Sequence, residues 1–140
     1  MIANTASKWV LFAAATLVSG LALAQQGGLD FGKREYDANC ASCHGAGGKG
    51  DGPFNELLKS RAPDLTTLAR RNNGVFPISR AYAAIDGGTA GHGSREMPVW
   101  GQDYRAKAGA YYMDVPYDPE VYVRTRILSL VEYLNRLQLK

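Results

Sequence analysis

The sequence predicts an all-α domain with long loops, because helical spacing of apolar residues recurs along the chain while no alternating strand pattern or internal repeat is present. The chain has 140 residues, of which 46% are apolar and 21% are charged. This is the composition of a globular protein, and it excludes a disordered, collagenous or multi-pass membrane protein. The helices offer few apolar contacts, so we expect something to fill the middle of the domain.

Residues 1–24 have the pattern of a secretory signal, with one cation at Lys8, an apolar run, and a small-x-small cleavage site that ends at Ala24. The run is shorter than the roughly twenty apolar residues needed to span a bilayer. We therefore expect cleavage and export to the periplasm of a single domain, residues 25–140, that does not span the membrane; retention of the segment as an anchor is the alternative. Periplasmic thiols are oxidised unless otherwise engaged, so the two cysteines need an explanation.

Start and stop signals place the short helices of this domain. In order, we expect a helix over Phe31–Asn39, a segment from Pro53 to Leu58, a segment capped by Asp64 that stops at Asn73-Gly74, and a segment from Pro77 to Ile85 closed by Gly87. A glycine-rich loop separates the first two, and an irregular stretch follows the last.

The C-terminal helix is the clearest element. Pro119 stands at its start, and apolar residues at helical spacing form one stripe, made of Val123, Ile127, Leu130, Val131, Leu134 and Leu137. The segment before it, Tyr104–Tyr117, is rich in tyrosine and is expected to be a surface loop in which Met113 packs.

One motif carries chemistry. Cys40, Cys43 and His44 form a C-x-x-C-H sequence, the attachment signal for c-type haem. Two thiols separated by two residues can each form a thioether with one vinyl group. The next residue then places an imidazole on the iron, so we expect His44 to be the proximal ligand.

Two other uses of these residues are weaker. A thioredoxin-like C-x-x-C site requires a βαβ unit, for which the chain has no strand pattern. A zinc site built from the motif and His92 would need adjacent residues, Cys43 and His44, as ligands, which is not the usual spacing.

Further motifs accompany the haem signal. Gly32 and Tyr36 precede it; Pro63-Asp64-Leu65, Met97-Pro98-Val99-Trp100-Gly101 and the pair Leu130 and Tyr133 follow it. Over nearly the whole mature chain, the sequence resembles a bacterial class I cytochrome c with one haem. The resemblance implies three to five short helices around a single covalent haem c. It also implies that the first and last helices cross where their glycine and aromatic positions meet.

The same resemblance implies the iron ligands. Met97, which precedes Pro98 in a polar stretch, matches the axial ligand opposite His44. His92, which lies between two glycines, is the rival ligand. A proline carbonyl is expected to accept a hydrogen bond from His44, and Pro63 matches that position better than Pro53.

Four residues are candidates for contacts with the haem. Trp100 is expected to pack near it with the indole N–H toward a propionate, although an ordinary core tryptophan is as good an interpretation. Arg61, Arg80 and Arg95 are candidates for pairing with the propionates, with solvated surface arginines as the alternative.

With both axial positions filled, iron has no place for a substrate, so we expect a one-electron carrier and not an enzyme. The formal net charge of +3 is too small for a nucleic-acid binder. Six basic and two acidic residues lie between Leu57 and Arg95, a bias expected to steer the protein to redox partners with an acidic patch.

The alternatives to a monomeric carrier are a haem subunit of a periplasmic dehydrogenase or oxidase, with Tyr104–Tyr117 as interface, and a peroxidase-like enzyme in which Met97 dissociates.

Overall fold

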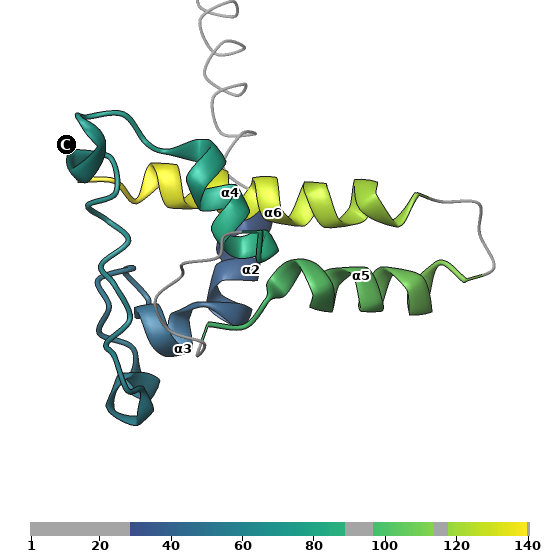
Figure 1. The fold of residues 1–140 in the computed structure, drawn as a ribbon, viewed down its shortest axis with the longest axis horizontal. Helices are drawn as coiled ribbons and strands as arrows, with labels where there is room; N and C mark the ends of the chain where they lie inside the picture. Colours follow the sequence, from purple (N-terminus) through teal and green to yellow (C-terminus); the bar gives the residue numbers. More distant parts are fainter. Residues whose placement is uncertain (1–28, 89–96, 114–117, 140) are drawn as a thin grey trace, which may run out of the picture. The chain divides into compact units, whose positions relative to one another are not determined.

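A computed structural model describes residues 29–88, 97–113 and 118–139, and every regular element in these ranges is a helix. The elements are α2 (Phe31–Asn39), α3 (Ala41–His44), the 3-10 turns η1 (Pro53–Leu57) and η2 (Arg70–Asn72), α4 (Ile78–Asp86), α5 (Trp100–Tyr111) and α6 (Pro119–Arg136). Figure 1 shows their arrangement. The prediction of an all-α fold is confirmed, whereas the predicted signal segment, residues 1–24, lies outside the described residues.

Helices α2 and α6 cross at the predicted positions. A Cβ atom on Gly32 would collide with the carbonyl oxygen of Ser129 and lie 2.8 Å from Cβ of Tyr133. One turn later, the rings of Tyr36 and Tyr133 pack with their centroids 5.2 Å apart. Only a glycine permits this approach, because any side chain would push the two helices apart.

Helix α6 begins as its sequence predicts. Pro119 takes the first turn, and the side chain of Asp118 caps the helix by accepting a hydrogen bond of 2.9 Å from the backbone N–H of Glu120. The apolar stripe is buried except for Leu137, which is partly buried, and Val123 and Ile127 are fully shielded from solvent. This stripe supplies the core against which α2, α4 and α5 pack.

The predicted surface loop Tyr104–Tyr117 is wrong over its first half, because residues up to Tyr111 belong to helix α5. Tyr104 and Ala108, four residues apart, are buried on one face and pack toward α6, which runs beside α5 in Figure 1. The sequence pattern does not predict this helix because its apolar face is narrow. Its alanines favour a helix, but only contact with α6 makes that preference decisive. Met113, expected to pack, is 78% exposed.

The segment between α3 and α4 is less regular than predicted. The helix expected from Pro53 is the short 3-10 turn η1, and its apolar side chains Phe54 and Leu57 face solvent. Asp64 does not cap an α-helix. Its carboxylate instead accepts hydrogen bonds from the backbone N–H and hydroxyl of Thr66, at 2.7 and 2.6 Å, and the chain turns there. The predicted stop at Asn73 is confirmed, since this residue has a φ of 55°.

Helix α4 confirms the prediction for its segment. It starts directly after Pro77 and ends at Gly87, which has a φ of 90° and closes the helix through its N–H to the carbonyl of Ala83. Ala81 and Ile85 are buried on the face that meets α6.

Candidate cofactor site

A cavity of about 420 Å³ lies within the helical domain. Its walls come from α2 and α3, from the segment between α3 and α4, from α4, from the start of α5 and from α6. Most of the lining is apolar and includes Leu65, Leu68, Ile85, Leu130 and Leu134. The space expected from the small number of apolar contacts is therefore present, and the C-x-x-C-H motif forms part of its wall.

The motif sits where one helix gives way to another. Cys40 follows the end of α2 and precedes the short helix α3, which contains Cys43 and His44. The backbone N–H groups of Cys43 and His44 both donate to the carbonyl of Cys40, at 3.2 and 2.9 Å. This single turn brings both thiols and the imidazole to the cavity wall.

The imidazole of His44 is held in one tautomer. Its Nδ1 lies 3.1 Å from the carbonyl oxygen of Pro63, and because a carbonyl can only accept, Nδ1 carries the proton. Burial lowers the pKa of His44, although the Pro63 hydrogen bond opposes this effect, so the ring is neutral. Nε2 is left with a lone pair for a metal ion. Pro63, and not Pro53, occupies the position that the sequence favoured.

The thiols do not have the character of a redox C-x-x-C pair. Burial, and to a smaller extent the nearby Glu35 carboxylate, raises the pKa of Cys40 to about 12. Reactive thiols of disulfide oxidoreductases have lowered pKa values, because the thiolate is the nucleophile. Within residues 29–88, 97–113 and 118–139, no group of three or more His, Cys, Asp or Glu side chains could hold a metal ion. The raised pKa of Cys40 weighs against the thioredoxin-like interpretation. The zinc interpretation depends on His92, which lies outside the described residues.

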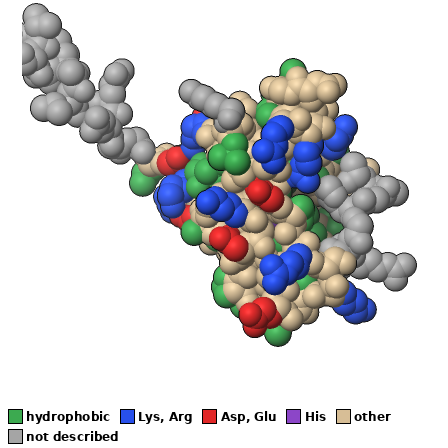
Figure 2. Space-filling view, turned by 90° about the vertical axis from the view of Figure 1, so that its left-hand side faces the viewer, with side chains coloured by type: hydrophobic (Ala, Val, Ile, Leu, Met, Phe, Trp, Pro, Cys, Tyr) green, Lys and Arg blue, Asp and Glu red, His purple; other side chains and the backbone are tan. Residues whose placement is uncertain are grey.

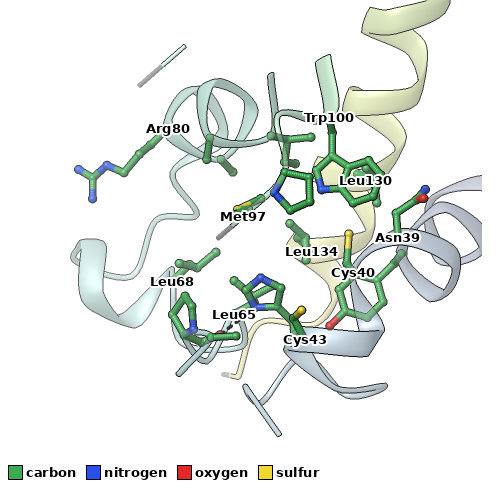
Figure 3. A pocket seen from close by; sticks show the side chains of 18 of the residues that line it. Asn39, Cys40, Cys43, Leu65, Leu68, Arg80, Met97, Trp100, Leu130 and Leu134 are labelled. Carbon is green, nitrogen blue, oxygen red and sulfur yellow. Dashed lines mark hydrogen bonds between the residues drawn. The ribbon is translucent and has the colours of Figure 1, made fainter. Parts of the chain in front are cut away.

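Met97 and Trp100 form another part of the cavity wall. Both line it, and Figure 3 shows them across the cavity from Cys43. Trp100 opens α5, and its ring centroid lies 6.3 Å from that of Tyr104. The rival ligand His92 and the propionate candidate Arg95 lie outside the described residues.

The two remaining arginine candidates, Arg61 and Arg80, line the cavity and are exposed. In Figure 3 the guanidinium group of Arg80 points away from the centre of the cavity. The structure thus places both residues at the rim, where solvent screens their charge.

The sequence analysis does not predict two features of the site. Asn55 is a buried polar residue in an exposed turn, and no pattern marks it. On the α2 side, the carboxylate of Glu35 pairs with Arg126 and accepts hydrogen bonds from the hydroxyl of Tyr104 at 2.8 Å and from Asn39 at 3.2 Å. Asn39 lines the cavity, so this network braces its wall. Tyr104 and Arg126 lie far from Glu35 in the sequence, so no local pattern indicates the network.

The residues present fit a c-type haem. Two thiols and a neutral imidazole lie on one side of an apolar cavity, and the thioether of Met97 lies across it. The hydroxyl of Tyr36 donates to the carbonyl of Gly45 at 2.6 Å and so anchors the backbone that follows the motif. A flat, mostly apolar group with two reactive vinyl positions and one metal matches this set of donors.

Comparisons with known proteins agree with this geometry. The family model described as cytochrome c matches residues 29–115. Searches of curated proteins and of solved structures gave no match. The match covers the C-x-x-C-H motif, the segment between α3 and α4 that lines the cavity, and α5. Helix α6 follows the matched residues and crosses α2. The chain therefore belongs to the cytochrome c family, and its cofactor is a covalently attached haem c with its iron.

Proposed function

We propose that this haem-based electron-transfer protein is a periplasmic one-electron carrier in which Cys40 and Cys43 hold the haem and His44 and Met97 are the axial ligands. The observation that carries the proposal is the placement of an oriented, neutral imidazole and a methionine thioether on one cavity. When bound, haem supplies a one-electron couple between ferric and ferrous iron.

The chain's own residues favour transfer over catalysis. With His44 and Met97 both bound to iron, peroxide and oxygen have no coordination position. A thioether ligand and the apolar lining favour the ferrous form, so we expect a positive reduction potential. Export by the N-terminal signal would provide the compartment, and a mature chain beginning at Gln25 would support it.

Charge on the loop side supports the choice of partner. Lys59, Arg61, Arg70, Arg71 and Arg80 are all exposed, and we call them the basic sector. Figure 2 looks onto the side of the domain formed by these loops, and Lys and Arg outnumber Asp and Glu on that face. Members of the family pass electrons to redox partners. We propose that the basic sector steers this protein to an acidic docking patch.

A dedicated haem subunit is the second candidate. Tyr111 and Met113, at the end of α5, are 79% and 78% exposed, and apolar side chains exposed in this way suit a permanent interface. In the part of the chain that the structure describes, no helix could cross a bilayer. A monomeric, fully reactive protein on size-exclusion chromatography would favour the diffusible carrier.

Absorption spectroscopy of the purified holoprotein in both redox states tests the ligand set. We expect the red methionine-to-iron charge-transfer band of the ferric protein to disappear in Met97→Ala and to persist in His92→Ala, which is the matched control. Potentiometric titration of the same samples gives the potential, which should fall in Met97→Ala. The opposite result, with the band lost only in His92→Ala, would contradict the assignment.

A further inference from the structure

Asn55 lies in a turn that buries its polar side chain and exposes its apolar ones. In η1 the apolar side chains Phe54 and Leu57 are 53% and 78% exposed, whereas Asn55 is only 8% exposed. A buried amide destabilises a protein unless its hydrogen-bonding groups are paired. The burial of Asn55 therefore depends on the hydrogen bonds that its side chain makes.

The Asn55 side chain is paired with three separate segments of backbone. Its Nδ2 donates to the carbonyl of Cys43 at 3.0 Å and to the carbonyl of Gly50. Its Oδ1 accepts from the N–H of Ala62 at 2.7 Å. One side chain thus joins the haem motif, the glycine-rich loop and the chain that leads into Pro63.

These segments carry the two partners of the His44 hydrogen bond. Cys43 immediately precedes His44, the donor, and Ala62 immediately precedes Pro63, the acceptor. Gly50 closes the arrangement, since its N–H donates to the carbonyl of His44 at 2.8 Å and a Cβ on it would collide with the carbonyl of Ala62. No other side-chain hydrogen bond in the described residues links Cys43 to Ala62.

We propose that Asn55 is a positioning residue that sets the hydrogen bond from His44 Nδ1 to the Pro63 carbonyl, and through it the reduction potential. The inference rests on the proposed function, in which His44 binds the iron. Donation by Nδ1–H raises the basicity of the imidazole, and a more basic ligand favours ferric iron. Loosening the contact therefore raises the potential.

The test uses the holoprotein with Asn55→Leu, which has a similar volume and none of the three hydrogen bonds. We expect an unchanged His/Met absorption spectrum, a higher potential, and exchange of the His44 Nδ1 proton that is about tenfold faster by NMR. Asn72→Leu is the matched control. Asn72 lies in η2, and its amide bonds only locally, to the Val75 carbonyl at 2.8 Å. That variant should leave the potential and the Nδ1–H exchange unchanged.

Equal potentials in wild type and Asn55→Leu, with the spectrum intact, would overturn the inference and leave the proposed function standing. A wild-type spectrum without His/Met ligation would instead contradict the proposed function. Should Asn55→Leu fail to fold, exchange in the unaltered protein decides the matter. The Ala62 amide proton and the His44 Nδ1 proton should exchange through one common opening, with similar protection. Rapid exchange at Ala62 beside a protected Nδ1–H would refute the link.

Discussion

The cavity side of the domain and the α5–α6 arm are held together by different means. In the cavity side, residues 45–77 contain only two 3-10 turns and depend on hydrogen bonds from side chains such as Asn55 and Gln138. The arm, made of α5 and the part of α6 that packs against it, consists of regular helices, and α5 buries Tyr104 and Ala108 on the face toward α6.

The difference follows from what each region surrounds. A helix presents one face, whereas a flat cofactor needs contacts from several directions, which an irregular chain can supply. An irregular chain needs side-chain hydrogen bonds to hold it in place, and Gln138 provides two of them. Its Nε2 donates to the carbonyl of Leu65 at 2.8 Å and its Oε1 accepts from the N–H of Ala69 at 2.9 Å, which joins the loop to the C-terminal end of the chain. We infer that the cavity side depends on its cofactor for stability and that the arm does not.

Haem removal should have the largest effect. Without the haem, water reaches the apolar lining of a cavity of about 420 Å³, which removes a large part of the apolar burial that stabilises a small domain. Protein lacking the haem, prepared as Cys40→Ala/Cys43→Ala, should show no cooperative thermal transition by calorimetry and reduced helical circular dichroism. Any remaining amide protection should lie in α5 and α6. A sharp transition with protection in residues 45–77 would contradict the comparison.

Two glycine substitutions, one at the α2–α6 crossing beside the cavity and one on the arm, should have smaller effects of opposite sign on the free energy of unfolding. Gly32→Ala places a methyl group against Ser129 at the α2–α6 crossing and should destabilise the holoprotein by about 1–3 kcal/mol. Gly109→Ala, in α5, meets no atom within 4 Å and should stabilise it by about 0.5–1 kcal/mol, because alanine has the higher helix propensity. Chemical denaturation measures both. Equal changes in the free energy of unfolding for the two variants would show that α2 and α6 can move apart at little cost in stability.

Charge reversal should have the smallest effect and should concern only rates. Arg61, in the basic sector, lines the cavity, whereas Lys107, on the arm, pairs with Asp103 at 2.7 Å. At low ionic strength, Arg61→Glu should slow reduction of anionic hexacyanoferrate severalfold and speed reaction with cationic hexaammineruthenium. Lys107→Glu should change neither rate appreciably. Stopped-flow measurements give these rates, and rising salt should abolish the rate difference between Arg61→Glu and the unaltered protein. Equal rates for Arg61→Glu and Lys107→Glu at low ionic strength would contradict the role of the basic sector in steering.

Elements with strong local signals were predicted well. The bounds of α2 and the start and buried stripe of α6 follow from capping residues and apolar spacing, which act within a few turns of helix. The α5 helix was missed because its burial of Tyr104 requires contact with α6, many residues later. The local spacing around Asn55 and Asp64 predicts helices, but hydrogen bonds between side chain and backbone, which join Asn55 to Ala62 and Asp64 to Thr66, stabilise turns there instead.

The sequence by itself determined the all-α class, the C-x-x-C-H chemistry and the glycine that allows α2 to cross α6, because each depends on residues close together in the chain or on a resemblance to a family. Only the tertiary structure decided that Asn55 joins Cys43 to Ala62 and that a tyrosine-rich segment is helical. It also supplied the hydrogen bond between His44 and Pro63 that the resemblance implied. These features depend on atoms brought together across many residues, and a hydrogen bond or a packed face exists only once the chain has closed around the cavity.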